Sequence, residues 1–372
     1  MGKFIPVAVP CFMGNEKKYV NDCLDTTWIS SNGKYIGEFE KAFSSYTRSK
    51  CAVACCNGTV ALHLPLLALG LMPGDEVIIP SFTYIATANA VRYCGATPVF
   101  ADSLADTWNI DPEDIRKKIT PKTKGIIPVH LYGNPCDMGS IMEIAKEHGL
   151  FVVEDAAECH GAEYDGQKAG SIGDVGTFSF FGNKIITTGE GGMIVTEDAA
   201  LAEKMRLLRG QGMDPARRYW FEIIGYNYRM TNIEAAIGLA QLENIDKLIA
   251  AREQVKNWYM EELEEELAMG LLLSQKTTDG AKSVCWMFSI LLPDGCIIER
   301  DVLMKKLADD GIETRPLFYP MHTMPAYYDE NADCPVAEAV ALNGLNLPTH
   351  ALLTHEDVVF ICDKIKSHIY DR

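Results

Sequence analysis

Two features that mark membrane proteins and nucleic-acid-binding proteins are missing from this sequence. It has no apolar run of about 18 residues, the length that a helix needs to cross a membrane. Its first residues, MGKFIPVAVP, lack the apolar segment of a secretory signal. Its 34 basic and 51 acidic residues give a net charge of −17, which repels nucleic acids and anionic lipids. We therefore expect a cytoplasmic protein with no nucleic-acid or membrane partner, in which local groups bind any phosphate.

Motifs of several nucleotide-binding and hydrolytic folds are also missing. The 12 cysteines form no Cys-x-x-Cys pair, so the sequence does not support a zinc ribbon or a thioredoxin-type site, and we expect no bound metal. No Gly-x-Gly-x-x-Gly, Gly-x-x-x-x-Gly-Lys-Ser/Thr or Gly-x-Ser-x-Gly segment occurs. The usual dinucleotide-binding fold, the P-loop nucleotidases and the α/β-hydrolases are therefore disfavoured.

What the sequence does contain is an alternation of short apolar segments and helical patterns. Hydrophobic residues make up 48% of the 372 residues and charged residues 23%, a balance typical of globular proteins. The apolar segments predict strands at 51–55, 76–82, 97–102, 125–130, 151–157, 176–181 and 192–196, and helical patterns lie between them at 60–70, 85–95 and 138–149. Several strands are apolar on both faces. We therefore predict an α/β fold with a mixed, mostly parallel sheet flanked by helices.

The second half of the chain is richer in helical patterns. It predicts helices at 199–209, 232–242, 246–265, 300–311 and 356–369, and a strand at 284–293. The long charged helix that begins at Asp246 could connect two domains. We therefore divide the chain into a large α/β domain, residues 1–247, and a small α+β domain, residues 248–372.

Lys184 is the first candidate for chemistry, because it follows a predicted strand in a loop that contains glycine. Ligands of open α/β sheets bind at the carboxyl ends of the strands. The apolar neighbours of Lys184 in the segment 180–186 would partly bury its amine, which lowers the pKa of the amine and favours a Schiff-base nucleophile. The alternative is a solvent-exposed lysine that happens to follow a strand.

Asp155 strengthens the first interpretation, because it ends the apolar strand FVVED. Pyridoxal 5'-phosphate chemistry needs both a Schiff-base lysine and a carboxylate that keeps the pyridine nitrogen protonated. The alternative role of Asp155 is to cap the following helix. The phosphate of such a cofactor needs a site of its own, and Asn57-Gly58-Thr59 precedes a predicted helix whose backbone N–H groups could bind it. Taken alone, that tripeptide is an ordinary turn.

Five segments in this order resemble one protein family. They are NGTVAL (57–62), PSFTY (80–84), EDAAE (154–158), SFFGNK (179–184) and GYNYRM (225–230). Together they are similar to the DegT-type sugar-nucleotide aminotransferases, which are fold-type I pyridoxal-phosphate enzymes, and the similarity extends from about residue 6 to the C-terminal helix. Lys184 distinguishes the chain from a branch of dehydratases that carry histidine at that position.

The resemblance implies a role for each matching residue. Lys184 would bind the cofactor covalently and move the proton, and Asp155 would pair with the pyridine nitrogen. Contacts to the ring and phosphate would come from Gly58, Thr59, Tyr84, Glu158 and Ser179. Asn227 would reach the cofactor phosphate of a neighbouring subunit, which implies a homodimer with shared sites. Tyr319 and His322 would lie near the sugar. Many family members have glutamine at the position of Glu158, where it contacts the phenolic oxygen of the cofactor. A charged carboxylate would be repelled by that oxygen, so we expect Glu158 to share a proton with it or to contact it indirectly.

Four further segments, 28–43, 184–196, 209–221 and 315–322, are most similar to the branch that transfers the amino group of L-glutamate to C4 of GDP-4-keto-6-deoxy-D-mannose, which forms GDP-perosamine and 2-oxoglutarate. The alternatives are a UDP- or dTDP-4-keto-6-deoxyhexose, a 3-keto sugar nucleotide, or a regulator that keeps the fold without turnover. Arginines that could contact the diphosphate are Arg209, Arg217, Arg218, Arg229 and Arg315.

Overall fold

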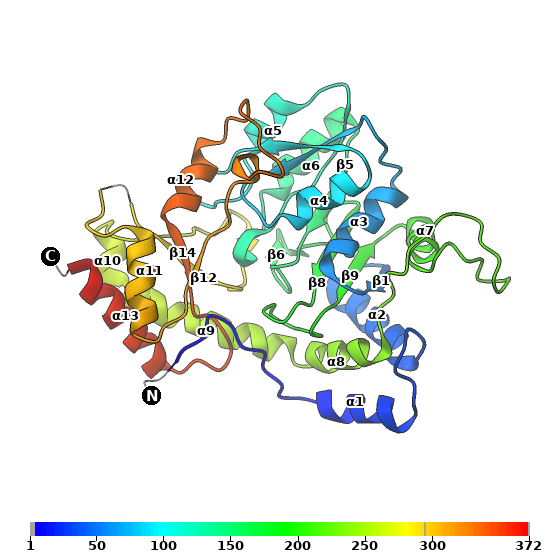
Figure 1. Cartoon of the computed structure of the whole chain (residues 1–372), viewed down its shortest axis with the longest axis horizontal. Coiled ribbons are helices and arrows are strands. Elements are labelled where there is room, and N and C mark those ends of the chain that lie inside the picture. The colour runs from blue at the N-terminus through cyan, green and yellow to red at the C-terminus, as the bar shows by residue number, and fades with distance from the viewer. Residues whose placement is uncertain (1–3, 294, 371–372) are drawn as a thin grey trace.

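A seven-stranded mixed sheet forms the centre of the larger part of the molecule (Figure 1). The computed structural model describes residues 4–293 and 295–370. The strands are β1 (Cys51–Cys55), β2 (Glu76–Pro80), β3 (Thr97–Ala101), β4 (Thr123–Ile126), β5 (Phe151–Asp155), β8 (Val175–Ser179) and β9 (Gly192–Thr196), in the spatial order β1-β9-β8-β5-β4-β2-β3. Strand β9 runs antiparallel to both of its neighbours and the other pairs are parallel. The prediction of a mixed, mostly parallel sheet is confirmed.

Helices cover both faces of this sheet because its strands are apolar on both sides. In β2, for example, Ile78 packs into one apolar cluster while Val77 and Ile79 pack into another. Helices α5 (Pro112–Lys118) and α6 (Met138–His148) supply the first cluster. The second cluster is supplied by α2 (Lys34–Thr47), α3 (Gly58–Ala68), α4 (Ala86–Tyr93), α7 (Ala199–Arg209) and α8 (Asn232–Leu242).

A second, smaller sheet lies beside the first and consists of antiparallel strands. It contains β10 (Leu273–Ser274), β12 (Phe288–Leu291), β14 (Gly344–Leu347) and β13 (Arg315–Pro316), in that spatial order. Helices α9 (Ile245–Glu262), α11 (Arg300–Asp309) and α13 (His355–Tyr370) share an apolar core with it. The domain boundary at residues 247 and 248 stays a prediction, and α9 runs across it.

Arg252 on α9 connects the two sheets. The residue is 3% exposed. It donates hydrogen bonds to the backbone carbonyl oxygens of Trp286 and Thr349, both at 2.8 Å, and to that of Lys184 at 3.4 Å. Because three distant segments meet at one side chain, the loop that carries Lys184 is fastened to the smaller sheet.

Several elements were not predicted from the sequence. They are α1 (Glu16–Asp25), α2, α5, α10 (Glu264–Ala268), α12 (Pro335–Asn343), the short helices η1 (Leu131–Gly133) and η2 (Met321–Thr323), the strands β10, β13 and β14 of the smaller sheet, and a small sheet of β6 (Glu163–Tyr164), β7 (Gln167–Lys168) and β11 (Ala281–Lys282). The predicted helix at 246–265 is interrupted at Leu263, and the predicted strand at 284–293 is limited to β12. No helix among residues 4–293 and 295–370 is long and apolar enough to span a membrane.

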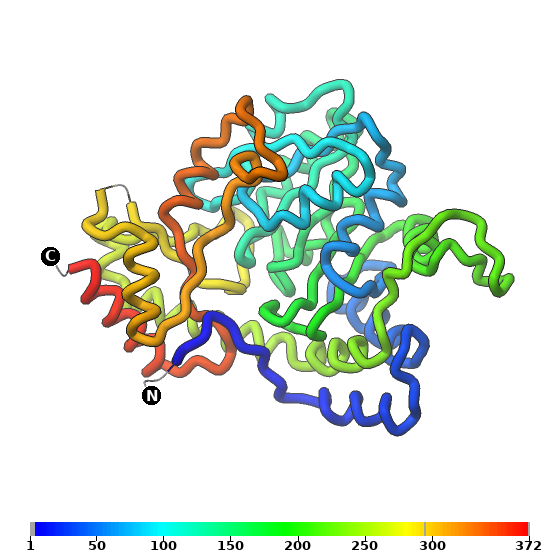
Figure 2. The backbone as a smooth tube through the Cα atoms, in the orientation of Figure 1, coloured from blue at the N-terminus to red at the C-terminus, as the bar shows by residue number. Residues whose placement is uncertain are grey.

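One segment extends away from the body of the molecule. Residues 210–228, between α7 and α8, form the arm at the right of Figure 2. Its exposed apolar side chains are Tyr219, Trp220, Phe221, Ile223 and Ile224, of which Ile224 is 92% exposed. An exposed group of this kind marks an interaction surface.

Candidate active site

A cleft of about 450 Å³ lies where β5 and β8 of the large sheet end, beside the N-terminus of α3. Of the residues predicted to form the site, seven line this cleft: Gly58, Thr59, Tyr84, Asp155, Glu158, Ser179 and Lys184. The smaller sheet contributes Arg315 from β13, and Trp286 and Phe318 come from the segments next to it. The site therefore forms at the carboxyl ends of parallel strands, as the rule for open α/β sheets predicts.

Lys184 lies in the loop that follows β8, with its side chain largely removed from solvent. Its side chain is 11% exposed, and its Nζ lies 3.6 Å from Oε1 of Glu158. Burial lowers the pKa of the Lys184 amine, while the nearby carboxylates of Glu158 and Asp155 act in the opposite direction. The alternative of a solvent-exposed lysine is excluded. The neighbouring Phe181 does not contribute the expected burial, because its ring is 49% exposed.

Asp155 is buried at the end of β5. Its Oδ2 accepts a hydrogen bond of 2.9 Å from the hydroxyl of Thr87, and its Oδ1 accepts one of 3.3 Å from the N–H of Ala157. Burial raises the pKa of the Asp155 carboxyl, although both hydrogen bonds oppose that shift. A buried carboxylate that lines a cleft can pair with a cationic group of a ligand.

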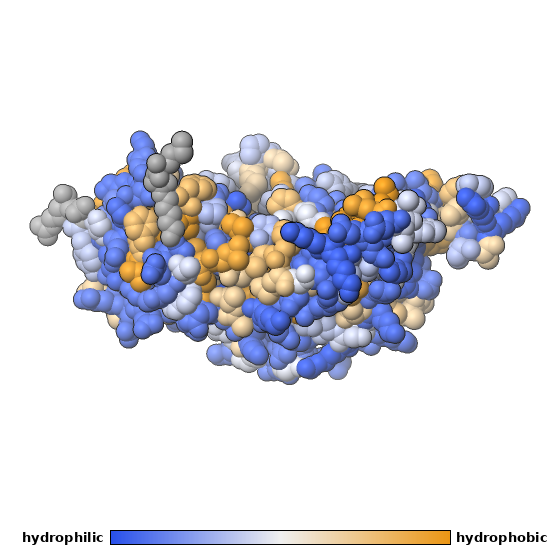
Figure 3. Space-filling model, turned by 90° about the horizontal axis from the view of Figure 1, so that it is seen from below, coloured by the Kyte–Doolittle hydropathy of each residue, from blue (hydrophilic) through white to orange (hydrophobic). Residues whose placement is uncertain are grey.

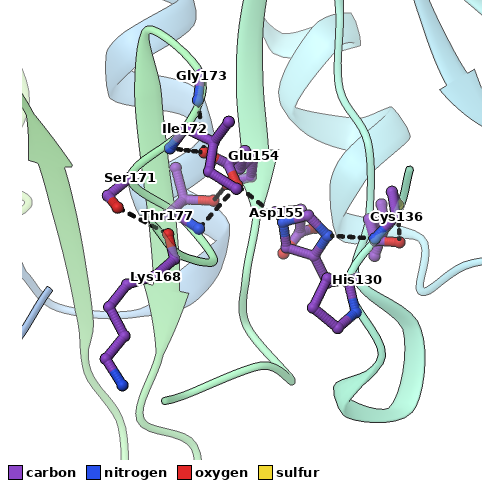
Figure 4. A network of polar contacts seen from close by, with 12 residues as sticks. His130, Cys136, Glu154, Asp155, Lys168, Ser171, Ile172, Gly173 and Thr177 are labelled. Atoms are coloured by element: carbon purple, nitrogen blue, oxygen red, sulfur yellow. Dashed lines mark hydrogen bonds and ion pairs between the residues drawn. The ribbon is translucent and has the colours of Figure 1, made fainter. Parts of the chain in front are cut away.

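Glu154 points away from Asp155, because neighbouring side chains of a strand face opposite sides of the sheet. Its carboxylate accepts three backbone N–H groups from the loop 170–173, at 2.6 to 2.8 Å (Figure 4). The N–H of Cys136 donates to Nδ1 of His130 at 3.0 Å, so the proton of that imidazole is on Nε2 and is donated to Glu154 at 2.9 Å. The side chains of His130 and Glu154 therefore fasten the end of β5 to its neighbours.

The N-terminus of α3 forms a candidate phosphate site. The side chain of Asn57 caps the helix by accepting a hydrogen bond from the N–H of Val60 at 3.0 Å. A Cβ atom at Gly58 would lie 2.6 Å from the Cβ of Ser179, so only glycine lets the helix start approach β8 this closely. Helix N-termini bind anions through their backbone N–H groups, and the hydroxyl of Ser179 adds a donor to this site.

Glu158 is the second buried carboxyl group of the cleft. Its Oε2 accepts a hydrogen bond of 2.9 Å from the N–H of Tyr132. Burial raises the pKa of Glu158 to about 7, while Lys184 acts in the opposite direction. The group can therefore carry a proton near neutral pH, and its expected contact with the phenolic oxygen of the cofactor stays a prediction.

Replacing Glu158 with glutamine is expected to make the protein relatively more stable at alkaline pH. The raised pKa means that the folded chain binds more protons than the unfolded chain below pH 7, so ionisation of Glu158 lowers the free energy of unfolding as the pH rises. We expect the stability difference between Glu158→Gln and wild type to grow by about 1–3 kcal/mol between about pH 5 and pH 8, measured by urea unfolding. The exposed Glu143→Gln variant is the control; an equal change in both variants would contradict the assignment.

Tyr84, Trp286 and Arg315 also line the cleft. The ring of Tyr84 is 60% exposed, as a residue that stacks on a ligand would be before binding. Trp286, whose ring lies against Lys184, was not predicted from the sequence. Among the five candidate arginines, all within the described residues, Arg315 is the one that lines this cleft.

Three predicted residues lie outside the cleft of this single chain. Asn227 is exposed at the base of the arm, where its Oδ1 accepts long hydrogen bonds from Arg229. Tyr319 is 52% exposed. His322 is buried, with its Nδ1 2.6 Å from the hydroxyl of Ser81 and its Nε2 3.0 Å from Glu338. The expected substrate contacts of Tyr319 and His322 stay predictions. In this chain the hydrogen bonds of His322 connect Ser81, directly after β2, to Glu338 on α12.

Comparison with known proteins places this cleft in a family context. Residues 10–366 match the model of the DegT/DnrJ/EryC1/StrS aminotransferase family. The chain is 58% identical to GDP-perosamine synthase of Caulobacter vibrioides over 95% of both chains, and 50% identical to GDP-perosamine synthase of Escherichia coli O157:H7 over the full length of both. The structure of the aminotransferase TlmJ from Streptoalloteichus hindustanus superimposes with a TM-score of 0.91, at 30% identity and 98% coverage of both chains. This chain therefore belongs to the DegT/DnrJ/EryC1/StrS aminotransferase family.

Proposed function

We propose that this protein is a pyridoxal-phosphate-dependent aminotransferase. It transfers the amino group of L-glutamate to C4 of GDP-4-keto-6-deoxy-D-mannose, which gives GDP-perosamine and 2-oxoglutarate. The observation that carries the proposal is the presence of a buried lysine, a buried carboxylate and a helix N-terminus in one cleft. The choice of sugar nucleotide is supported by the similarity to two proteins named GDP-perosamine synthase.

The residues of the cleft fit pyridoxal phosphate. Gly58, Thr59 and Ser179 would hold the phosphate, where a side chain at residue 58 would collide with Ser179. Asp155 would pair with the pyridine nitrogen, and Tyr84 would stack on the ring. When bound, the cofactor supplies an electron sink and a carbonyl group that can exchange amines.

Lys184 would act as the general acid and base of both half-reactions. Its Nζ would first hold the cofactor and then, once free, move a proton from the α-carbon of L-glutamate to the cofactor. In the second half-reaction the same Nζ would move a proton from the cofactor to C4 of the sugar. Burial lowers the pKa of this amine, which brings it nearer to the range in which a group both gains and loses protons. Glu158, at 3.6 Å from Nζ, would share a proton with Lys184.

The substrate can be tested with separate keto-sugar nucleotides. Incubation with L-glutamate and GDP-4-keto-6-deoxy-D-mannose is expected to release 2-oxoglutarate and to form an amino-sugar nucleotide that mass spectrometry identifies. The UDP and dTDP counterparts in parallel reactions are expected to react at least about tenfold more slowly, because a site shaped for one base leaves polar groups unpaired with another. Faster reaction of either counterpart would replace the GDP sugar as the substrate, and no reaction with any of them would reject the function.

The same family resemblance leads us to propose a homodimer with shared active sites. The apolar side chains of the arm, residues 210–228, are exposed in the single chain, and apolar areas also interrupt the polar surface in Figure 3. Asn227 lies at the base of this arm and outside the cleft of its own chain. In the proposed dimer, Asn227 would reach the phosphate site of the partner subunit.

Mixing two inactive variants is expected to restore activity if the sites are shared. A dimer of Lys184→Ala with Asn227→Asp contains one site in which both residues are native. Equal co-expression of the two would therefore give about a quarter of the wild-type activity, since half of the dimers are mixed and one of their two sites is intact. Mixing Lys184→Ala with Asp155→Ala is the control, since both residues belong to the same subunit's cleft and no native site can form. Equal activity of the two mixtures would contradict the shared site.

A further inference from the structure

The amine of Lys184 lies on the face of an aromatic ring. Its Nζ is 3.8 Å from the centroid of Trp286, whose side chain is 5% exposed. A cation within about 6 Å of an indole centroid is attracted by the negative face of the ring, and indole is the strongest of the aromatic side chains in this respect. Removal from water strengthens the attraction, because water no longer screens it.

Two contacts fix the orientation of the Trp286 ring, and a third supports one of its partners. Its Nε1 donates a hydrogen bond of 2.9 Å to the backbone carbonyl of Asn183, the residue before Lys184. The ring of Tyr132 stacks on it with a centroid distance of 6.1 Å and an interplanar angle of 10°. Phe318 in turn stacks on Tyr132 at 5.5 Å and the same angle. The indole is therefore held by groups of both sheets, and its face is available to the amine without rearrangement.

The charged groups around Lys184 stabilise its ammonium form only in part near neutral pH. An aromatic ring, whose effect does not depend on titration, can therefore contribute. Glu158 and Asp155 favour the ammonium form of Lys184. Glu158, however, has its pKa raised to about 7 by burial, so its own charge is only partly present near neutral pH. The remaining neighbours add little: His160 is neutral, because burial lowers its pKa to about 3, and Arg252 contacts only the backbone carbonyl of Lys184. Glu190 and Arg315 lie at the wall of the same cleft.

We propose that the indole face of Trp286 binds the amine of Lys184 whenever that amine is protonated and not joined to the cofactor. This state occurs in the cofactor-free protein and, if the proposed function holds, also while the amine carries the proton within each half-reaction. Trp286 is then a catalytic residue, because it touches the nitrogen that carries the proton. It would hold the charged form of Lys184 at a fixed place while the proton is moved.

The test measures the protonation of Lys184 directly, in the full-length protein freed of cofactor. Trace labelling with acetic anhydride from about pH 6 to about pH 10 modifies only neutral amines, and mass spectrometry of the peptide that contains Lys184 gives the rate at each pH. Trp286→Leu is expected to move the midpoint of this curve to lower pH and to raise the rate at neutral pH about fivefold, with the same rate at high pH. Trp286→Phe, with a weaker aromatic face, is expected to fall between the two.

The control is Trp258→Leu, the same substitution at a half-buried tryptophan of α9 whose ring contacts His355 instead. It is expected to leave the curve unchanged. A midpoint of Trp286→Leu that is unchanged or moves to higher pH overturns the proposal, since a loss of packing alone admits water and would raise the pKa of the buried amine. An equal shift in Trp258→Leu also overturns it. If circular dichroism shows that Trp286→Leu does not fold, Trp286→Phe decides. Because no substrate is present, a failed aminotransferase assay leaves this result intact.

Discussion

Lys184→Ala is expected to reduce amino transfer by about 10³-fold or more, while the protein stays folded and still binds the GDP sugar. The reason is that one nitrogen both holds the cofactor and moves the proton at each reacting carbon, so no other group of the cleft can replace it. The measurement is the rate of 2-oxoglutarate release, together with calorimetric titration of the sugar nucleotide. Binding is expected to persist because the diphosphate does not depend on the amine.

The control for this experiment is Lys50→Ala, the same substitution at an exposed lysine. It is expected to keep wild-type activity. Wild-type activity in Lys184→Ala would show that the catalytic lysine has been assigned wrongly. An equal loss in both variants would point to instability of the protein rather than to chemistry.

Glu154→Ala is expected to cause the largest loss of stability of any single change considered. The substitution leaves three backbone N–H groups of the loop 170–173 and the Nε2–H of His130 without an acceptor inside the protein. Each buried donor that is left without an acceptor costs about 1–3 kcal/mol, so the total loss is expected to be at least about 3 kcal/mol. Urea unfolding of the cofactor-free protein, followed by circular dichroism, measures this difference.

Glu143→Ala, on the exposed surface of α6, is the matched control and is expected to change the free energy of unfolding by less than about 0.5 kcal/mol. Glu154→Gln tests the charge separately, because it keeps the shape but presents an amide NH₂ to donors. It is expected to lie between wild type and the alanine variant. A Glu154→Ala protein as stable as the Glu143→Ala protein would contradict the network.

Much of the large sheet could be predicted because buried strands are short, continuous apolar segments. Strands β1 and β9 and helices α7 and α8 have the predicted ends. The predicted strand at 125–130 was wrong in part, since β4 ends at Ile126, ahead of Pro128, which has no N–H to donate. Helices α1 and α2 were missed.

The site was predictable where a residue follows a strand and not where it depends on distant contacts. Lys184 and Asp155 could be predicted as cleft residues because Asp155 ends an apolar strand and Lys184 lies in the loop that follows another. Trp286 was hidden within a segment predicted as one strand, 284–293, whereas the structure begins β12 only at Phe288. The residues before β12 bring Trp286 to the cleft, and no local pattern in the sequence indicates that turn.

The three hydrogen bonds of Arg252 limit how this molecule can move. A hinge between the two sheets would separate the carbonyl groups of Lys184, Trp286 and Thr349, and would leave a buried guanidinium without some of its acceptors. Such an opening is costly, so substrates should exchange through the mouth of a cleft whose floor is already assembled. The protein would then bind its two substrates in turn without a change of conformation between the two sheets. Only the molecule bound in the cleft would differ.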